Sequence, residues 1–505
     1  MPDRPKRSNN MGTDRRTFLR LSAIGAGALF LPRGLYAGRE DRLVTSRLRM
    51  KKQYEDTSPI FNMSGYRAPR IPVVRMGFLG LGDRGGSAVI RYTYLEGVEI
   101  KALNDKREAA VRGSQKALQE AGLPQAEAYY GSEDAWKAVC ERDDIDLIYI
   151  CTNWANHTPM ACYAMEQGKH VAVEVPAAVT LEEAWQLVET SERTKKHCMM
   201  LENCCYDFFE LLTLNMARQG YFGDLVHAEG AYLHNLLDLN FNKPKDEEQY
   251  DAGYTDMWRL KQNRRNGNLY PTHGLGPVCQ IMNINRGDKM EYLTSMSSAD
   301  FGMAQRAEEL AQKDPFYAPF AEGSYRGNMN TTLIRTYQGR TLMIQHDVTS
   351  LRPYSRIHQV TGQNAMARKW PSPAKISNGH RWVDKKGMKK LKRKYTFEMV
   401  KKIGKMAKKV GGHGGMDFLM DWRLIDCLRN GLPLDQDVYD AALWSAIAPL
   451  SEWSVANRSN SVDVPDFTRG NWKTNAPVNL DMKGGGTTGV RDVSKADRKK
   501  QMKVH

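Results

Sequence analysis

Apolar runs in the first part of the chain alternate with amphipathic stretches. The runs predict buried strands over residues 76–79, 98–103, 147–151, 170–173 and 198–201. Between them, apolar residues recur at helical spacing over 106–121, 160–167 and 180–194. Thr180 and Glu183 have the spacing of a capping box at the start of the last helix. Strands that alternate with helices predict an α/β fold with a doubly wound parallel sheet of the Rossmann type.

From about residue 206 the pattern changes to longer strands that are separated by polar loops. Strands are predicted over 226–233, 290–296, 331–337 and 341–348. Because several of them follow one another without a helix, they predict an α+β domain with an open, mostly antiparallel sheet. Helices are predicted over 418–430 and 438–457, and we expect them to pack back onto the body of the protein.

The first predicted strand ends in a Gly-x-Gly-x-x-Gly motif formed by Gly80, Gly82 and Gly85. The first glycine permits a tight turn, the second lets the backbone approach a pyrophosphate, and the third lets the next helix pack closely. Asp105 lies 20 residues after Gly85, where a carboxylate is expected to bind an adenosine ribose. An acid there would repel a 2′-phosphate, so the motif favours NAD. A glycine-rich turn without a ligand is the alternative.

The N-terminus has the features of an export signal. Arg15 and Arg16 precede a short apolar stretch, which resembles a twin-arginine signal with a cleavage site after Ala37. The stretch is shorter than the roughly 20 apolar residues that span a bilayer, so we expect an exported, periplasmic protein without a stable membrane anchor. The twin-arginine route exports folded proteins, so a cofactor would be loaded in the cytoplasm and would stay bound.

These patterns predict five regions. They are a signal peptide (1–37), an N-terminal linker (38–73), an NAD-binding Rossmann domain (74–205), a substrate-binding α+β domain (206–470) and a flexible C-terminal tail (471–505).

The formal net charge of +15 over 505 residues raises the question of a nucleic-acid partner. The excess is concentrated in residues 385–409 and 491–503, which lack the interleaved aromatic residues of a stacking platform, so we expect no nucleic acid. A solvated basic face or a flexible insertion is favoured over attraction to an anionic cell surface or polysaccharide. The eight cysteines show no Cys-x-x-Cys spacing, which favours a reduced interior over a zinc site, and no metal is expected.

Polar and aromatic side chains are concentrated in residues 258–277. Tyr270 and His273 are separated by Pro271 and Thr272, so a rigid turn could present both rings to one pocket. Histidine titrates near neutrality and can exchange protons with a hydroxyl group, and tyrosine can act as a positioned donor. Tyr270 and His273 are therefore candidate catalytic residues. A packed aromatic side chain and a hydrogen-bonded loop histidine are the alternative interpretation.

Several motifs are similar to those of the Gfo/Idh/MocA-like oxidoreductases, and specifically of glycoside hydrolase family 109. They are the glycine motif, Glu174-Val175-Pro176, and residues 202–206, 267–274 and 412–417. Most members of the wider superfamily have Glu-Lys-Pro at the second motif, and the lysine serves the proton transfer that accompanies hydride transfer. Val175 can neither donate nor accept a proton.

The resemblance implies an NAD-dependent α-N-acetylgalactosaminidase. In that reaction NAD oxidises C3 of the sugar, a base removes the C2 proton, the aglycone leaves, water adds, and the hydride returns to C3. The cofactor is restored in each cycle, which agrees with the export argument. An NAD-dependent sugar oxidoreductase and a non-catalytic sugar-binding protein are the alternatives. The substrate would be a small molecule or a glycan, with glucosamine or galactose derivatives as other sugars, and a homodimer is possible.

The resemblance also assigns individual residues. Proton transfer at the C3 hydroxyl or C2 falls to His273 and Tyr270, with Tyr206 as a lesser candidate, and Arg259 would hold the substrate. Sugar-contacting positions are Tyr232, Arg259, Tyr270, Pro271, Thr272, His273 and Tyr354. Cofactor positions, together with the three glycines of the motif, are Asp83, Arg84, Asp105, Trp154, Ala155, Asn156, His157, Glu174, Val175 and Asn203.

Overall fold

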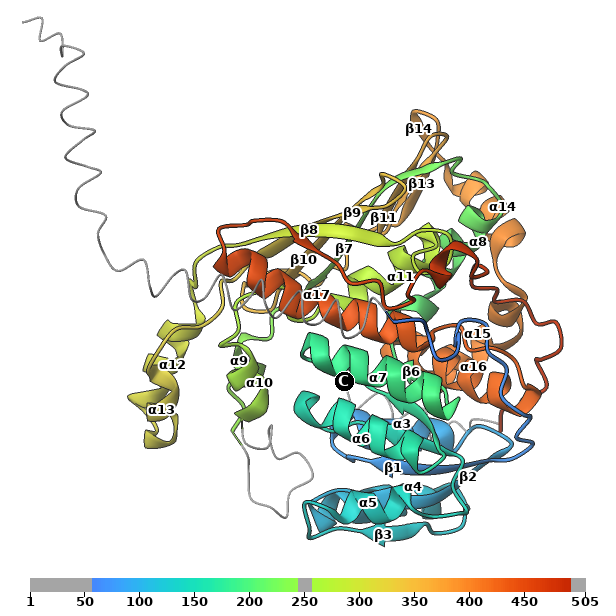
Figure 1. Ribbon diagram of the computed structural model, residues 1–505, viewed down its shortest axis with the longest axis vertical. Helices are drawn as coiled ribbons and strands as arrows, with labels where there is room; N and C mark the ends of the chain where they lie inside the picture. The colour runs from blue at the N-terminus through green and yellow to red at the C-terminus, as the bar shows by residue number, and fades with distance from the viewer. Residues whose placement is uncertain (1–56, 244–256, 492–505) are drawn as a thin grey trace, which may run out of the picture. The chain divides into compact units, whose positions relative to one another are not determined.

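The computed structural model describes residues 57–243 and 257–491 (Figure 1). Contacts divide the chain into two units, Met1–Thr57 and Ser58–His505, and the fold is that of the second unit. The predicted twin-arginine signal, most of the linker and the tail beyond residue 491 lie outside the described residues. Among the helices of the described ranges, none combines the length and the apolar character that crossing a membrane requires.

A six-stranded parallel sheet forms the first part of the fold, with strand order β3-β2-β1-β4-β5-β6. Its strands are β1 (Val74–Leu79), β2 (Val98–Asn104), β3 (Glu127–Tyr129), β4 (Leu147–Ile150), β5 (His170–Val173) and β6 (Cys198–Met200). This order confirms the doubly wound Rossmann prediction. The order reverses between β1 and β4, where such sheets bind ligands. β3 was not predicted, because its three residues are largely exposed and form no apolar run.

Five helices connect these strands: α3 (Asp83–Tyr92), α4 (Glu108–Glu120), α5 (Ala135–Cys140), α6 (Trp154–Glu166) and α7 (Leu181–Thr194). The capping box of Thr180 and Glu183 is present at the start of α7, as predicted. α6 begins six residues before its predicted start. The prediction began the helix after Pro159, because proline usually ends or precedes a helix, but here Pro159 lies inside it. This difference puts Trp154 in the first turn of α6, at the carboxyl end of β4.

The second sheet has nine strands in the order β14-β13-β12-β11-β7-β10-β9-β8-β15, and only β7 and β10 pair in parallel. The mostly antiparallel prediction is therefore confirmed. Its strands are β7 (Leu225–Leu233), β8 (Met290–Ser297), β9 (Asn330–Thr336), β10 (Thr341–Asp347), β11 (Gln359–Gly362), β12 (Met366–Arg368), β13 (Lys375–Asn378), β14 (Arg381–Trp382) and β15 (Val462–Asp463). The strands that the sequence missed, β11 to β15, have two to four residues, too few for a periodic pattern.

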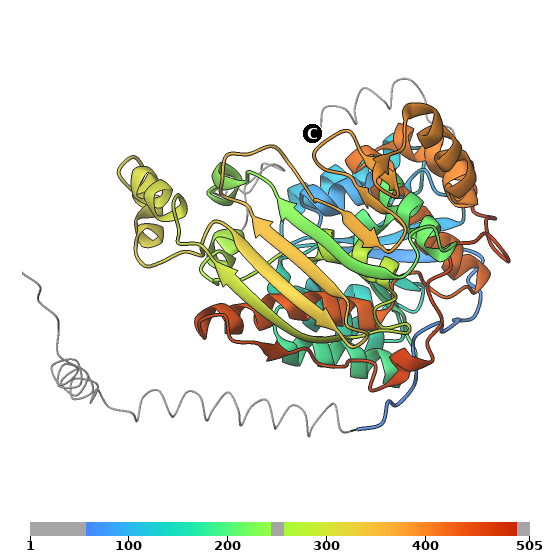
Figure 2. The same ribbon diagram turned by 90° about the horizontal axis from the view of Figure 1, so that it is seen from above.

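Helices α11 (Thr272–Met282) and α17 (Val438–Ala456) lie against the second sheet (Figure 1), and Figure 2 shows the same sheet from above, with the red helix α17 behind it. α17 also packs on α7, and so joins the two sheets (Figure 1). α11 contacts β7 at two glycines: a Cβ on Gly274 would lie 2.1 Å from the backbone nitrogen of Ala231, and a Cβ on Gly230 would lie 2.3 Å from the carbonyl oxygen of Gly274. This close approach holds the first turn of α11 against the sheet.

The other helices are shorter or peripheral, apart from α8 and α16 near the core. They are η2 (Asn203–Tyr206), α8 (Phe208–Arg218), α9 (Leu237–Asn240), α10 (Trp258–Gln262), α12 (Met303–Ala311), η4 (Pro315–Tyr317), α13 (Ala318–Ala321), α14 (Lys385–Tyr395), α15 (Glu398–Val410), η5 (His413–Gly415), α16 (Met416–Asn430) and η6 (Asn471–Lys473). The lysine-rich segment thus forms α14 and α15, which corrects the flexible-insertion alternative and leaves two others open: a solvated basic face, and attraction to an anionic cell surface or polysaccharide.

The described part of the predicted flexible tail, residues 471–491, packs against the body of the protein. The Asp426 carboxylate accepts hydrogen bonds from the N–H groups of Gly486, Thr487 and Thr488. Val490 forms an isolated antiparallel bridge with Leu95. The structure therefore corrects the prediction for these residues. Glycines and charges near a chain end resemble the composition of a disordered tail, but here backbone hydrogen bonds to a buried carboxylate order the segment.

Candidate active site

The glycine motif forms the turn between β1 and α3, and its three glycines meet different requirements. A Cβ on Gly80, whose φ is +83°, would lie 2.6 Å from the carbonyl oxygen of Cys151. A Cβ on Gly85 would lie 1.9 Å from the carbonyl oxygen of Gly80. The nearest atom to a Cβ on Gly82 is 3.8 Å away, on the Arg107 side chain. Gly80 and Gly85 therefore permit close packing, while Gly82 leaves room for a ligand at the start of α3.

Asp105 lies beside this turn, at the carboxyl end of β2. Its Oδ2 accepts a hydrogen bond of 2.8 Å from the N–H of Leu81, and its Oδ1 accepts one of 2.9 Å from the N–H of Arg107. These bonds hold a carboxylate next to the glycine turn. The turn, the helix N-terminus and the acid at the next strand end together fit an adenine dinucleotide.

Arg84, in the first turn of α3, links the glycine turn to the C-terminal half of the chain. Its guanidinium donates to Glu174 Oε1 at 2.7 Å and to Asp417 Oδ2 at 2.9 Å. Asn203 donates to the other oxygen of Asp417. Burial acts to raise the pKa of Asp417, but the charges of Arg84 and Arg91 outweigh it and hold that pKa well below its ordinary value. The site therefore includes an ionised carboxylate, Asp417, for which the sequence predicted no role.

The predicted cofactor residues on α6 lie in its first turn, and their exposure differs. Trp154 is 8% exposed, Ala155 is exposed and Asn156 is half-buried. His157 is buried, with Nδ1 2.7 Å from the carbonyl oxygen of Pro176 and Nε2 3.0 Å from that of Thr152. Burial lowers the pKa of His157. His157 thus braces the Pro176 backbone, beside the buried side chain of Val175, whereas Asp83 is exposed on α3.

A pocket lies where the first turn of α6 meets β7 and the start of α11. Its lining combines aromatic and polar side chains: Trp154, Tyr232, Asn240, Arg259, Gln262, Asn263, Leu269, Tyr270, His346 and Val348. The Tyr270 ring is stacked with that of Trp154, with centroids 5.7 Å apart and planes 21° apart. The Tyr232 ring lies 5.0 Å from the Tyr270 ring. Trp154 of the Rossmann part and two predicted sugar-contacting tyrosines thus share one pocket.

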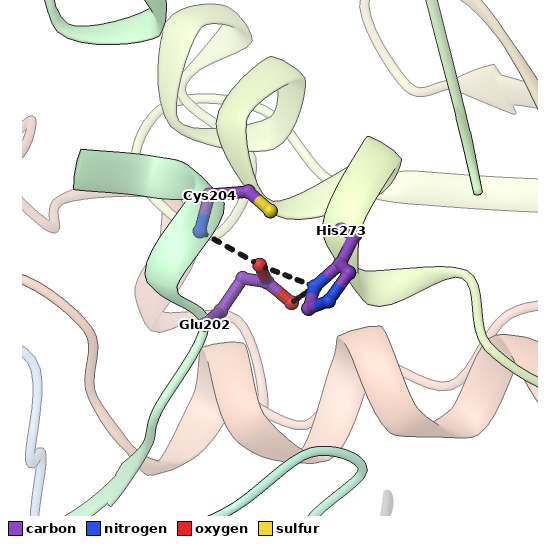
Figure 3. A group of neighbouring side chains, drawn as sticks. All are labelled: Glu202, Cys204 and His273. Carbon is purple, nitrogen blue, oxygen red and sulfur yellow. Dashed lines mark hydrogen bonds and ion pairs between the residues drawn. The ribbon is translucent and has the colours of Figure 1, made fainter. Parts of the chain in front are cut away.

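His273 borders this pocket and is paired with a buried carboxylate, Glu202 (Figure 3). The Nδ1 atom of His273 lies 2.8 Å from Oε1 and 3.0 Å from Oε2 of Glu202. The His273 ring is 5.1 Å from the Tyr232 ring and 4.9 Å from the Tyr270 ring. His273 was a predicted catalytic residue, whereas Glu202 had no predicted role, although it belongs to the motif at 202–206.

Glu202 is fully buried. Burial acts to raise its pKa, but the charge and the hydrogen bond of His273, with further bonds from Thr272 and the N–H of Cys204, outweigh burial and lower the pKa. The ionised carboxylate then binds the proton on Nδ1 of His273, which leaves Nε2 to exchange a proton with a substrate.

Cys204 completes a group of three potential metal ligands with Glu202 and His273, whose ligand atoms lie within 4.8 Å of one another (Figure 3). Two contacts argue against a metal centre there. Nδ1 of His273 is engaged by Glu202, and Nη1 of Arg356 lies 3.0 Å from the sulfur. Burial raises the pKa of the Cys204 thiol. A thiol beside a guanidinium is a poor cation ligand, so we interpret the group as a proton-transfer pair next to a structural cysteine.

The other predicted residues lie at different depths. Tyr354 is 37% exposed and its ring is 6.2 Å from that of Tyr232. The Arg259 guanidinium lies over the Trp258 ring, 5.2 Å from its centroid. Pro271 and Thr272 are buried at the start of α11, between Tyr270 and His273. Tyr206 is buried and donates to Asp435 at 3.1 Å, which gives it a role in the core.

Comparisons with known proteins first define the class, an NAD-binding oxidoreductase fold. Residues 74–202 match the model of the oxidoreductase family with an NAD-binding Rossmann fold. Residues 206–474 match the model of the glycosyl hydrolase 109 C-terminal domain. The chain therefore belongs to glycoside hydrolase family 109, and it is a glycoside hydrolase with an NAD-binding fold.

The chain is 51% identical over 413 residues to a protein from Bacteroides fragilis named alpha-N-acetylgalactosaminidase. The match covers 81% of this chain and 95% of that protein. It is 48% identical over 426 residues to a glycosyl hydrolase family 109 protein from Porphyromonas gingivalis, covering 80% and 86%. All eight cysteines lie within the described residues and are free.

Two solved structures share the fold at low identity. Levoglucosan dehydrogenase, in a complex with NADH and L-sorbose, matches with a TM-score of 0.56 and 16% identity, over 78% of this chain and all of that chain. The aldose-aldose oxidoreductase from Caulobacter crescentus, complexed with glycerol, matches with a TM-score of 0.52 and 13% identity, over the same shares. At these identities the likeness shows the fold alone.

Proposed function

We propose that this protein is an exported glycosidase that hydrolyses N-acetylgalactosaminides, or closely related sugars, with a bound NAD that is regenerated in each turnover. The sugar is supported by the 51% identity to the Bacteroides fragilis protein. The observation that carries the mechanism is the position of the His273–Glu202 pair beside the pocket that Trp154, Tyr232 and Tyr270 line.

The Rossmann part supplies the residues that would hold NAD: the glycine turn at Gly80, Gly82 and Gly85, the N-terminus of α3, and Asp105. When bound, NAD would take a hydride from C3 of the sugar and later return it. The substrate-side residues must then move the protons, because Val175 is buried and apolar.

His273 is the proposed base. An ionised Glu202 on Nδ1 stabilises the imidazolium that forms when Nε2 takes a proton from the substrate. Tyr270 is the proposed donor: burial raises the pKa of its phenol, and the charges of Tyr232, Glu174 and Glu202 add to that effect, so the hydroxyl keeps its proton. Arg259, in the pocket lining, would hold the sugar.

The domain organisation is part of the proposal. Residues 74–205 would bind NAD, residues 206–470 would bind the sugar, and residues 1–37 would direct the folded protein through the twin-arginine route. Replacing both Arg15 and Arg16 by Lys should retain the protein in the cytoplasm, while Arg20→Lys should leave export unchanged. Cell fractionation measures both, and export of the double variant would contradict the signal.

One experiment separates the proposal from its alternatives. Purified protein is mixed with chromogenic α- and β-N-acetylgalactosaminides without added NAD, and aglycone release and absorbance at the NADH band are followed together. The proposal expects aglycone release without accumulation of NADH, and heat denaturation should release NAD from the protein. Stoichiometric NADH would instead indicate a sugar oxidoreductase, and sugar binding without either product would indicate a binding protein.

A further inference from the structure

Helix α14 presents a strongly cationic surface to solvent. Seven exposed side chains of its eleven residues are basic, and we call them the basic face: Lys385, Lys386, Lys389, Lys390, Lys392, Arg393 and Lys394. The remaining side chains, Met388, Leu391 and Tyr395, pack on a hydrophobic cluster that includes Ala367 of β12 and Ile376 of β13. The apolar side of the helix therefore packs on the protein, and the seven basic side chains are exposed to solvent.

This arrangement is electrostatically unfavourable for the helix itself. Lys385 and Lys389, Lys386 and Lys390, and Lys389 and Arg393 are like charges at i,i+4 spacing, which destabilise a helix. Across residues 57–243 and 257–491, no acidic side chain forms an ion pair with the basic face. The carboxylate of Asp384, which begins the helix, accepts a hydrogen bond from the N–H of Gly387. An external anion would relieve this repulsion.

An exposed tryptophan lies near the start of the basic face. Trp382 is 44% exposed, on the edge strand β14, two residues before Asp384. The Arg368 guanidinium and the Lys375 ammonium lie 5.5 and 5.6 Å from the centroid of its ring. Figure 1 shows β14 and α14 at the same end of the second sheet. An aromatic face flanked by cations suits a sugar ring that carries anionic groups, because the ring packs and the cations bind the charges.

Aromatic contacts lead from the candidate active site to Trp370, and the chain from Trp370 to Arg368 continues toward Trp382. Tyr354, whose ring is 6.2 Å from the pocket residue Tyr232, lies 5.9 Å from the Trp370 ring. The Trp370 ring also has the Lys369 ammonium 4.6 Å from its centroid. Two residues before Trp370 is Arg368, which lies over Trp382. A polymer whose end enters the pocket could therefore follow this path to the basic face.

We propose that the basic face and Trp382 bind an anionic polysaccharide, a chain that carries sulfate or uronate groups, outside the pocket that cleaves the sugar. The surface favours this ligand over two other polyanions. Beside the basic face, Trp382 is one exposed aromatic side chain and not the repeated stacking platform that single-stranded nucleic acid uses. An amphipathic helix that enters a lipid surface does so by its apolar side, and the apolar side of α14 is covered by the protein.

Binding is tested on the complete protein with dextran sulfate as the probe and unsulfated dextran as the matched neutral polymer. The triple variant Lys386→Gln, Lys389→Gln, Lys390→Gln removes three charges with side chains of similar helix propensity. The control triple variant Lys116→Gln, Lys313→Gln, Lys483→Gln removes three exposed lysines elsewhere. It therefore has the same net charge as the basic-face variant. Trp382→Ala tests the aromatic contact separately. Affinity is measured by isothermal titration calorimetry at two salt concentrations.

We expect dextran sulfate, but not dextran, to bind. The basic-face variant should lose about tenfold in affinity, since three exposed charge contacts are removed, and the control triple variant should lose less than about twofold. Trp382→Ala should weaken binding without changing its salt dependence, whereas the basic-face variant should reduce that dependence. Cleavage of a small chromogenic substrate should be unchanged in all three, so a failure here is distinct from a failure of the proposed reaction.

Three results would overturn the proposal. Equal losses in the two triple variants would show that net charge, and not this surface, attracts the polymer. Equal binding of dextran and dextran sulfate would remove the role of the cations. Tighter binding, through the same three lysines, to vesicles of anionic phospholipid or to single-stranded DNA would assign the surface to a different partner.

Discussion

Val175 shows how one side chain changes what the rest of a site must do. It is 4% exposed next to Glu174, and the resemblance to the wider superfamily implies that a lysine serves proton transfer at this position. In the proposed reaction, a valine there leaves proton transfer to residues on the other side of the pocket. The His273–Glu202 pair, 2.8 Å apart and adjacent to Tyr232 and Tyr270, is the arrangement that we propose takes and returns the proton.

Replacing His273 by Ala removes the proposed base. We expect hydrolysis of a chromogenic N-acetylgalactosaminide to fall by at least roughly a hundredfold, the usual contribution of a general acid or base. The content of bound nucleotide should stay the same, because His273 lies outside the glycine turn. Steady-state kinetics and nucleotide released by heat measure the two effects, and near-normal turnover with NAD still bound would remove His273 from the mechanism.

Glu202→Gln tests the positioning carboxylate while it keeps the size of the side chain. A neutral amide cannot stabilise an imidazolium and can present a donor to Nδ1, so kcat should fall on the order of a hundredfold with little change in KM. Glu189→Gln, which changes a partly exposed carboxylate on α7, serves as the control. A loss of thermal stability in Glu202→Gln that accounts for the whole loss of activity would reduce Glu202 to a structural role.

At the scale of elements, close backbone approaches position the site. Gly274 and Gly230 let α11 lie directly on β7, which brings His273 and Tyr232 together. Gly80 and Gly85 do the same for the glycine turn and α3. In both places a methyl group would collide with backbone atoms, which cannot move aside as a flexible side chain can.

Gly85→Ala and Gly82→Ala should separate packing from binding. In Gly85→Ala the new Cβ would meet the carbonyl oxygen of Gly80 at 1.9 Å, so we expect a lower melting temperature together with loss of the nucleotide. In Gly82→Ala the nearest atom is 3.8 Å away, so the melting temperature of the nucleotide-free protein should be unchanged while the nucleotide affinity falls. Thermal unfolding and nucleotide titration measure both; equal effects of the two variants would contradict this division.

At the scale of the whole molecule, ion pairs with buried carboxylates join the N-terminal Rossmann part to a helix from the C-terminal part of the chain. Arg84 pairs with Asp417, and Arg91 donates to Asp421 at 2.6 Å, so α3 of the first sheet is linked to α16. Buried histidines add a dependence on pH. His197 is 4% exposed, with its ring 5.1 Å from that of His170, and burial, followed by the charge of Lys196, lowers its pKa to about 4.

Stability should therefore fall as the pH decreases from about 6.5 to about 4. In that range an unfolded histidine, with an ordinary pKa of about 6.5, binds a proton that the folded His197 does not, so the free energy of unfolding falls by up to about 1.4 kcal/mol per pH unit. Asp421, whose pKa burial raises to about 6, acts in the opposite direction, so the test is a difference between variants.

Urea unfolding at pH 7 and pH 5 measures this difference. His197→Phe keeps a ring beside Tyr66 and His170 and should show a smaller loss of stability between the two pH values than the unchanged protein. His380→Phe, at an exposed position, should leave the loss unchanged. An equal loss in His197→Phe and in the unchanged protein would show that His197 does not contribute.

The sequence by itself determined the order of the main strands and helices, the glycine turn and the candidate pair Tyr270 and His273. Such features depend on periodicity and on short-range backbone geometry, which neighbouring residues specify. The tertiary structure decided what the charged residues contact. Glu202 pairs with His273, Asp417 pairs with Arg84, and Asp426 accepts hydrogen bonds from the backbone of residues 486–488. A buried charge costs desolvation free energy, which only a partner of opposite charge or a hydrogen-bond donor can offset. Here that partner comes from another element, and the sequence does not show which one.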